Sequence, residues 1–370
     1  MFTRYLAEQV KSDLKQKMVF LGGARQIGKT TLAKSILTKD SVYLNWDIPE
    51  HRELILKGEV PQGTMLVLDE VHKFKDWRQY LKGIFDLFGI TKKILVTGSA
   101  RLDYYRFGGD SLQGRYHYLR MLPLSVSELG IKSNKDLRTL LALSGFPEPF
   151  FSGSEIEAQR WSREYRSRLI QEDIVSLENT TSLQKIELLM LRLPSLVGSP
   201  LSINSLREDL NVSHKAVSSW IEILERLYAI FRLPPYESNL LRAVKKEQKH
   251  YHYDWTLVKE EGLRFENMVA VHLLKWVFWQ QDTLGQDLEL RYFRDIDGRE
   301  VDFVIVRNGK PFLCVECKIK DESVSRAMLY FLNKFPDCAC WQITLDGTKD
   351  VTTKEGIRIA PAQVFLGDLV

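Results

Sequence analysis

Short, uninterrupted apolar runs alternate with segments of helical periodicity in the first third of the chain. The run MVFLGG at 18–23 precedes a segment, 29–37, whose apolar residues fall three and four apart on one helical face. Two further runs, MLVLD at 65–69 and ILVT at 94–97, have the length and continuous apolarity of strands that are buried on both faces. The pattern therefore predicts an α/β domain with a parallel sheet.

The middle of the chain changes to a helical pattern. From 134 to 198 apolar residues recur three and four apart, and no strand-like run intervenes. The segment 199–254 then predicts a helix, a short turn near Asn211, and a second amphipathic helix that begins after Ser213 as its N-cap. The apolar face of this second helix is predicted to comprise Val217, Trp220, Ile221, Leu224 and Leu227.

The last third predicts a helix at 262–280 with a broad apolar stripe, followed by a hairpin at 300–320. A helix-like stretch at 322–335 and a strand at 338–345 come next. Both faces of the predicted hairpin EVDFVIVRNGKPFLCVECKIK are apolar, whereas an exposed hairpin would alternate polar and apolar residues. We therefore expect a sheet that is covered by helices on both faces.

Length and charge narrow the class of protein. The chain has 370 residues, of which 44% are apolar, which predicts two to four domains. Its 52 Lys and Arg against 48 Asp and Glu give a net charge of +4, so any nucleic-acid contact must be local. The first residues are charged throughout and no long apolar stretch occurs, which favours a cytoplasmic protein without a membrane span.

The four cysteines cluster near the end of the chain, at Cys314, Cys317, Cys338 and Cys340. Their CxxC and CxC spacings are compatible with a zinc site. On a strand, however, residues 314 and 317 would point to opposite faces, so two of the four ligands would not meet. We expect reduced thiols in a hydrophobic core instead.

Residues 23–30, GARQIGKT, fit the pattern GxxxxGK[ST] between an apolar run and a helical segment. Glycines at these positions let backbone N–H groups curl around a phosphate at a helix N-terminus. Lys29 would reach the terminal phosphates of ATP, and the Thr30 hydroxyl would bind Mg²⁺. The predicted nucleotide cradle comprises Gly23, Ala24, Arg25, Gln26, Ile27, Gly28, Lys29, Thr30 and Thr31.

Hydrolysis of ATP also needs a metal-orienting acid and a group that activates water, both at the ends of parallel strands. Asp69 would hold the Mg²⁺ shell and Glu70 would polarise the attacking water, although a strand that ends in solvated acids is the alternative. Ser99 follows the next strand and would sense the γ-phosphate. Arg115 would reach a transition-state phosphate in its own or a neighbouring subunit, unless it is a surface arginine.

Five stretches occur in an order that resembles a large group of mostly uncharacterised bacterial and archaeal AAA-type ATPases. They are GGARQIGKTTLAKS, MLVLDEVHKFKDW, VTGSARL, SLQGRYHYLRMLPLSVSEL and SGFPEPF. The C-terminal part of those proteins is a domain of unknown function. The resemblance implies an ATP-binding and ATP-hydrolysing core, and it assigns roles to Lys29, Thr30, Asp69, Glu70, Ser99 and Arg115.

The segments after this core have two interpretations each. The helices at 134–198 would form a lid over the nucleotide or a plain linker. The two helices at 199–254 have the layout of a winged helix, with Lys245, Lys246 and Lys249 as a basic patch on its wing. Such modules either read DNA or dock proteins, so DNA, a protein partner and self-association through the ATPase domain all remain possible partners.

The C-terminal order of helix, two strands, helix and strand resembles the core of the PD-(D/E)xK restriction-endonuclease-like fold. The resemblance implies that Asp302 and Glu316 bind a metal, that Lys318 is catalytic, and that Glu266 is an additional helix carboxylate. Carboxylates would hold Mg²⁺, and the lysine would steady the attacking water. The alternative for Glu266 is a carboxylate that is stabilised by the helix dipole.

This site depends on the register of the hairpin. A two-residue turn at Asn308–Gly309 would pair Asp302 with Val315 and turn Glu316 to the opposite face. The site therefore needs a shift of register, and we expect it at Pro311, which cannot donate a ladder hydrogen bond.

We therefore expect four parts: a P-loop ATPase core at 1–133, a helical lid at 134–198, a winged-helix-like domain at 199–254 and an αβα nuclease-like domain at 255–370. One hypothesis is an ATP-driven enzyme that acts on DNA through a metal-dependent nuclease domain. The other is a nucleotide-dependent switch or DNA-binding regulator whose C-terminal domain is inactive.

Overall fold

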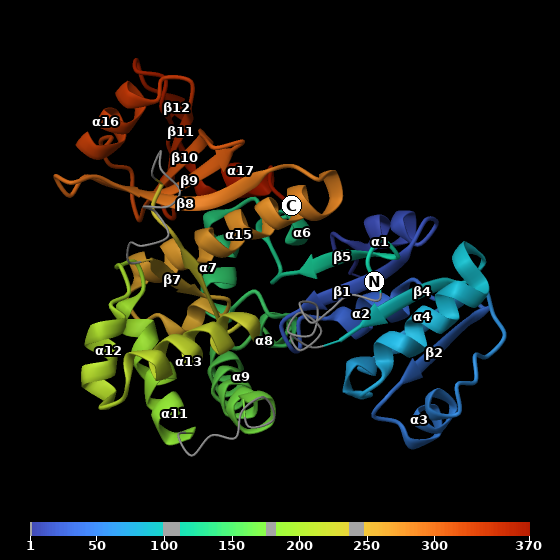
Figure 1. The fold of residues 1–370 in the computed structure, drawn as a ribbon. Coiled ribbons are helices and arrows are strands. Elements are labelled where there is room, and N and C mark those ends of the chain that lie inside the picture. Colours follow the sequence, from blue (N-terminus) through green and yellow to red (C-terminus); the bar gives the residue numbers. More distant parts are fainter. Residues whose placement is uncertain (1, 99–111, 175–182, 237–247) are drawn as a thin grey trace. The chain divides into compact units, whose positions relative to one another are not determined.

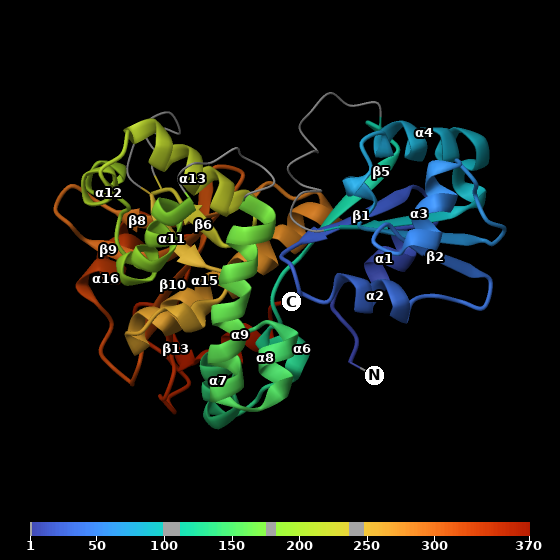
Figure 2. The same ribbon diagram turned by 90° about the horizontal axis from the view of Figure 1, so that it is seen from below.

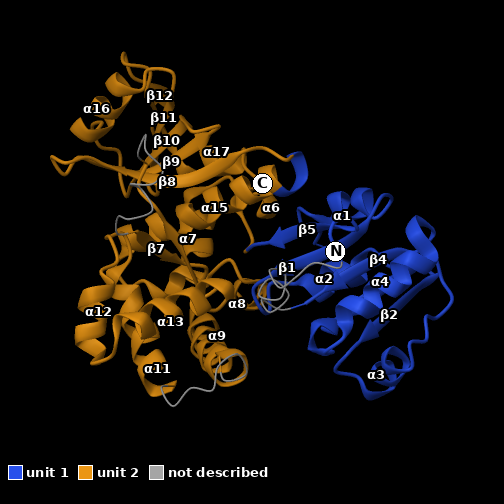
Figure 3. Ribbon diagram, viewed as in Figure 1, with its two compact units in different colours: residues 1–122, 282–284 blue, residues 123–281, 285–370 orange. Residues whose placement is uncertain are grey.

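The computed structural model describes residues 2–98, 112–174, 183–236 and 248–370. The chain forms two compact units (Figure 3). The first contains residues 1–122 with 282–284, and the second contains residues 123–281 with 285–370.

The first unit is a parallel α/β domain (Figure 1). Its sheet has the order β2-β3-β4-β1-β5, and each neighbouring pair is parallel. The predicted α/β domain is confirmed. Its elements are α1 (Ala7–Asp13), β1 (Met18–Gly23), α2 (Lys29–Ser35), β2 (Ser41–Asn45), α3 (Pro49–Leu56), β3 (Met65–Asp69), η1 (Val71–Lys73), α4 (Trp77–Phe88), η2 (Gly89–Thr91), β4 (Lys93–Thr97) and β5 (Tyr116–Met121).

Helices cover both faces of this sheet because its central strands are apolar on both faces. Alternate residues such as Phe20, Leu66 and Val96 pack in one core with Trp77 and Leu81 of α4. On the opposite face α2 contacts β1 and β4 (Figure 2). The carboxyl ends of β1, β3 and β4 therefore lie along one edge of the sheet, where the predicted phosphate-binding residues begin.

The second unit begins with helices. They are α6 (Val126–Leu129), α7 (Asn134–Leu143), α8 (Pro147–Ser152), α9 (Glu155–Arg168), the π-helical turn η3 (Leu169–Ile174), α11 (Leu183–Arg192) and η4 (Leu193–Leu196). Ser125, Ser133 and Ser154 each accept a hydrogen bond from a backbone N–H in the first turn of the helix that follows. These caps explain why α6, α7 and α9 begin where they do.

Two further helices and a two-stranded sheet follow in the predicted order. They are α12 (Ile203–Leu210), α13 (His214–Arg226), β6 (Ile230–Leu233) and the antiparallel β7 (Lys249–His252). Ser213 caps α13, and the predicted apolar face of α13 is buried. Lys245 and Lys246 lie outside the described residues. A winged helix that reads DNA stays a prediction.

Lys249 contradicts the predicted basic patch. Its side chain is 1% exposed, and the neighbouring rings of Tyr251 and Tyr253 are buried as well. The prediction treated Lys249 as a surface lysine because its neighbours in the sequence are charged and polar. The structure instead pairs it with carboxylates from distant segments.

The C-terminal part of the second unit combines a long helix with a mixed sheet. The helix predicted at 262–280 is confirmed as part of α15 (Glu261–Leu284), which follows η5 (Trp255–Leu257). The sheet has the order β12-β13-β11-β10-β9-β8. Its elements, with two further helices, are β8 (Leu288–Arg294), β9 (Glu300–Arg307), β10 (Lys310–Lys318), α16 (Arg326–Lys334), β11 (Ala339–Thr344), β12 (Val351–Thr352), β13 (Arg358–Pro361) and α17 (Ala362–Gly367).

The register shift predicted at Pro311 is confirmed. Pro311 pairs with Val306, whereas Leu313 pairs with Ile305, so one residue of β10 is left over between them. The shifted register reaches Val315, which pairs with Phe303. One residue further along, this register places Glu316 opposite Asp302.

Of the four cysteines predicted to be core thiols, Cys314, Cys338 and Cys340 are buried in the apolar core between α16 and the sheet, whereas Cys317 is only partly buried. Within the described ranges, no helix is both long enough and apolar enough to cross a membrane.

Candidate functional site

Two glycines determine the backbone conformation of the loop between β1 and α2. Gly23 has φ 137°, and a Cβ at this position would lie 2.3 Å from the carbonyl oxygen of Met121. Gly28 has φ 96° at the N-cap of α2. Both glycines are therefore required by conformation, and Gly23 also by close contact with β5.

Lys29 lies at the start of α2 and is 7% exposed. Its Nζ donates hydrogen bonds to the carbonyl oxygens of Gly23 at 3.0 Å and Ala24 at 2.5 Å. The ammonium is thus held over the loop, in the place from which a P-loop lysine meets phosphate oxygens.

Asp69, at the end of β3, is the centre of a hydroxyl cluster. Its Oδ2 accepts from Thr30 Oγ1 at 2.8 Å and from Tyr43 OH at 2.6 Å. Its Oδ1 accepts from Thr97 Oγ1 at 2.6 Å. The carboxylate is 3% exposed, and burial together with this carboxylate raises the pKa of Tyr43 well above its ordinary value. Asp69 and Thr30 therefore meet, as the predicted Mg²⁺ site requires, and oxygen donors of this kind suit Mg²⁺.

Glu70 follows directly, with an unusual left-handed backbone at φ 56°. This conformation turns its side chain, 22% exposed, toward Lys73 Nζ at 3.4 Å and His72 Nε2 at 3.7 Å. Burial raises the pKa of Glu70, while the charges of Lys73 and Lys29 oppose the rise. A strained residue with a raised pKa next to a P-loop has the properties of a general base for water.

Two members of this site were not predicted, Thr97 and Tyr43. Thr97 ends β4, so the strand pattern that identified Asp69 also contained the signal for Thr97. The prediction chose Ser99 instead, and Ser99 lies outside the described residues. Tyr43 gives no signal in the sequence, because only the pairing of β2 with β3 places it beside Asp69.

The remaining predicted residues of the first unit are Arg25, Gln26, Thr31 and Arg115. Arg25 and Gln26 belong to the loop itself, and Thr31 lies in the first turn of α2. Arg115 Nε lies 3.2 Å from Asp86 Oδ1, and both side chains are partly exposed. The structure therefore gives Arg115 an acidic neighbour on its own unit, and its action on a phosphate stays a prediction.

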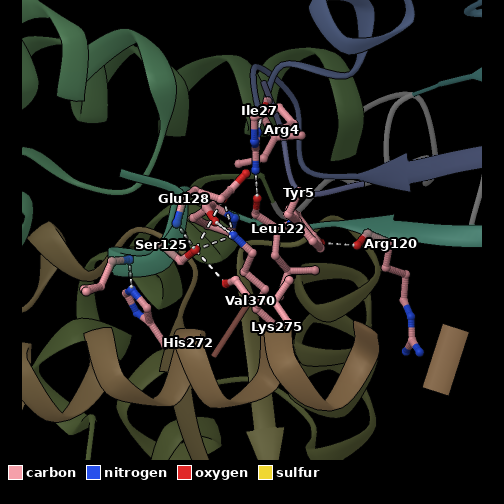
Figure 4. Close-up of polar contacts among 12 residues, drawn as sticks. Arg4, Tyr5, Ile27, Arg120, Leu122, Ser125, Glu128, His272, Lys275 and Val370 are labelled. Carbon is pink, nitrogen blue, oxygen red and sulfur yellow. Dashed lines mark hydrogen bonds and ion pairs between the residues drawn. The ribbon is translucent and has the colours of Figure 1, made fainter. Parts of the chain in front are cut away.

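Arg4 is another residue that the sequence did not reveal. It is 6% exposed, and its guanidinium donates to the carbonyl oxygens of Ile27 in the phosphate loop and Leu122 after β5 (Figure 4). Tyr5 OH donates to the carbonyl of Arg120 at 2.7 Å. The segment before α1 thus fixes the phosphate loop against β5.

In the C-terminal part of the second unit, Asp302 and Glu266 belong to one buried cluster. Cys317 N–H donates to Asp302 Oδ2 at 2.8 Å, and Tyr251 OH donates to Glu266 Oε1 at 2.7 Å. Burial and the nearby Glu266 raise the pKa of Asp302 to about 8. The buried ammonium of Lys249 lies in the same cluster.

Glu316 and Lys318 form an ion pair that also interacts electrostatically with Asp302. Lys318 Nζ lies 2.9 Å from Glu316 Oε1, and Ser325 Oγ donates to Glu316 Oε2 at 2.7 Å. Both oxygens of Glu316 therefore have partners within the protein. Burial would lower the pKa of Lys318, but Glu316 outweighs it and the pKa is raised.

The predicted metal ligands Asp302, Glu316 and Glu266 are neighbours, and each accepts a hydrogen bond from another group of the protein. Among the described residues, no three His, Cys, Asp or Glu side chains are arranged to hold a metal ion. A second register shift lies between Arg291 and Phe293 of β8, opposite the part of β9 that contains Asp302.

Three family models match this chain. Residues 15–130 match an AAA domain, residues 134–261 match a domain of unknown function (DUF8612), and residues 261–365 match a second domain of unknown function (DUF4143). With the geometry above, the first match identifies the N-terminal part as an AAA-type P-loop domain.

The descriptions of the curated relatives name no function. An uncharacterised protein of Mycobacterium tuberculosis and one of Mycobacterium bovis are each 22% identical over 326 residues, which is 84% of this chain and 72% of theirs. Among solved structures, Thermotoga maritima RuvB is 17% identical, with 62% of this chain and 89% of RuvB covered at a TM-score of 0.30. The S. cerevisiae Hsp104–ADP complex is 15% identical, with 61% and 39% covered at 0.30. Scores this low carry no conclusion about function.

Proposed function

We propose that this protein hydrolyses ATP at the loop between β1 and α2 and uses the cycle as a nucleotide-dependent switch. The observation that supports this best is the hydrogen bond from Thr30 to Asp69, because it joins the two residues that would hold Mg²⁺. When bound with ATP, Mg²⁺ would neutralise charge on the phosphates.

Each residue has a distinct task in this proposal. Backbone N–H groups from 24 to 30 bind phosphate oxygens, and Lys29 exchanges its two loop carbonyls for the terminal phosphates. Thr97 keeps the Asp69 carboxylate oriented. Glu70 accepts the proton of the attacking water, since its raised pKa brings it nearer to neutral pH.

Phosphate release from purified protein, measured with Mg²⁺ and ATP, tests the proposal. Wild type should turn over ATP, Lys29→Ala should neither bind nor hydrolyse it, and Glu70→Gln should bind without hydrolysis. Binding of ATP without turnover by the wild type would argue against an ATPase.

Metal-dependent cleavage of DNA is the second candidate function. The shifted register at Pro311 favours it, since it brings Glu316 into line with Asp302. The partners of both carboxylates oppose it, since each already accepts hydrogen bonds from the protein. We therefore favour the first candidate function, a nucleotide-dependent switch whose C-terminal domain does not cleave DNA.

The two candidates separate on plasmid and linear DNA with Mg²⁺ or Mn²⁺, with and without ATP. If the protein is a nucleotide-dependent switch, the DNA should remain uncut under every condition. Cutting that Asp302→Ala abolishes would establish the nuclease, and cutting that survives in Asp302→Ala would point to a contaminant. Lys29→Ala in the same assay shows whether any cutting depends on ATP.

A further inference from the structure

A lysine ammonium is buried among the carboxylates of the C-terminal sheet. Lys249, the first residue of β7, is 1% exposed. Its Nζ lies 2.5 Å from Glu300 Oε1 and 3.7 Å from Glu266 Oε1, and Asp302 is close enough to interact with it electrostatically. The ring of Tyr292 lies 5.3 Å away. One cation is therefore enclosed by three acids.

Other groups of the protein also contact these acids. Tyr251 OH donates to Glu266, Cys317 N–H donates to Asp302, and Arg294 Nη1 lies 3.6 Å from Glu300 Oε2. Buried charges are tolerated only when they are paired and hydrogen-bonded, and here each acid is.

We propose that Lys249 is the resident counter-ion of Glu266 and Glu300, and that the cluster these residues form with Asp302 binds no divalent cation while the ammonium is seated. A divalent ion on Glu266 or Asp302 would lie within a few ångströms of a buried positive charge, where repulsion is weakly screened. Metal binding and the position of Lys249 are thus mutually exclusive.

Lys249 and the three acids lie in regions of the chain that match different family models. Lys249 lies in the region 134–261 that matches one domain of unknown function, whereas the three acids lie in 261–365, which matches the next. The strand β7 therefore supplies the cation that neutralises the acids of its neighbour. This inference concerns the site of the second candidate function and is independent of ATP hydrolysis.

Binding of Mn²⁺ to nucleotide-free protein, followed by electron paramagnetic resonance of the free ion, tests the proposal. Lys249→Met should gain one Mn²⁺ site at least about tenfold tighter than any in the wild type, because the acids lose their cation. Adding Asp302→Asn to that variant should remove the new site. Mn²⁺ should also raise the Tm of Lys249→Met and leave that of the wild type unchanged.

Lys275→Met is the matched control. Lys275 is also 1% exposed, and its ammonium contacts one acid, Glu128, together with the hydroxyl of Ser125 and the carbonyl of Pro123 (Figure 4). The Lys275→Met variant should be less stable than the wild type and should not gain an Mn²⁺-binding site. If Lys249→Met does not fold, as judged by circular dichroism, Lys249→Met with Glu300→Gln removes a cation and an anion together and takes its place. Wild-type binding of Mn²⁺ that depends on Asp302, or a folded variant without the new site, would overturn the proposal.

Discussion

Thr30 Oγ1 donates a hydrogen bond of 2.8 Å to Oδ2 of Asp69, across 39 positions of the sequence. The first residue belongs to α2 and the second ends β3, and the parallel sheet brings them together. We expect Asp69→Asn to reduce ATP hydrolysis by at least about 10²-fold, because the neutral amide binds Mg²⁺ poorly. Nucleotide affinity in the presence of EDTA should change only a few-fold, since the phosphate loop itself is intact.

Tyr43→Phe is the matched control for this prediction. It removes one donor to the same Asp69 oxygen but leaves the carboxylate charged. Hydrolysis should therefore fall by less than about tenfold, because the carboxylate keeps its charge and its hydrogen bonds from Thr30 and Thr97. Equal losses in Tyr43→Phe and Asp69→Asn would mean that Asp69 acts only by holding the hydroxyl cluster together.

The pH dependence of hydrolysis should report on Glu70. Its pKa is raised, chiefly by burial, and only its carboxylate form accepts a proton from water. The value of kcat should therefore fall as the pH is lowered, with a midpoint above the ordinary 4.5 of a glutamate. Glu70→Gln should lower kcat by at least about 10²-fold and lose this acidic limb. A limb of the same midpoint in the residual activity of Glu70→Gln would assign it to another group.

The phosphate-binding loop could be predicted from the sequence, whereas the cluster around Lys249 could not. The proximity of Lys29, Thr30 and Asp69 could be predicted because it depends on local spacing and on the ends of apolar runs. Pro311 was found because a residue without an N–H disturbs a ladder wherever it stands. These signals are local in the sequence, so they can be recognised without knowledge of the tertiary structure.

Lys249 was placed wrongly for the opposite reason. Its neighbours in the sequence suggested a solvated basic wing, and nothing near it indicates Glu266 or Glu300. Long-range pairing also determines Tyr43 and Arg4, and the register shift opposite the part of β9 that contains Asp302 lies in the strand β8 rather than in the hairpin. Charge balance in a buried cluster is a property of the packed structure.

His272 should make the second unit sensitive to acid. Its Nε2 accepts from Val126 N–H at 3.1 Å, and its Nδ1 lies 2.8 Å from the Met268 carbonyl, so the neutral ring satisfies both (Figure 4). Burial lowers its pKa from 6.5 to about 4. The unfolded chain therefore binds the proton first, and stability is complete above pH 6.5 and is lost as the pH falls toward 4.

Urea unfolding at pH 7, 6 and 5 measures this loss. Each pH unit between those limits should cost up to about 1.4 kcal/mol for such a histidine. His272→Gln keeps a polar group at the site and should show a shallower pH dependence, even if it is less stable at pH 7. Identical slopes in the two proteins would assign the acid sensitivity to other groups, of which the buried His250 is the first to examine.

Two glycine substitutions should have opposite effects on stability. A Cβ on Gly145, in the SGFPEPF stretch, would lie 2.5 Å from Trp255 and 2.7 Å from Pro123, whereas a Cβ on Gly83 meets nothing within 4 Å. Gly145→Ala should therefore cost about 1–3 kcal/mol through overpacking. Gly83→Ala, in the exposed middle of α4, should stabilise by up to about 1 kcal/mol, because glycine loses more backbone entropy on folding than alanine. Thermal unfolding checks both, and an unchanged Tm for Gly145→Ala would show that Trp255 has room to move.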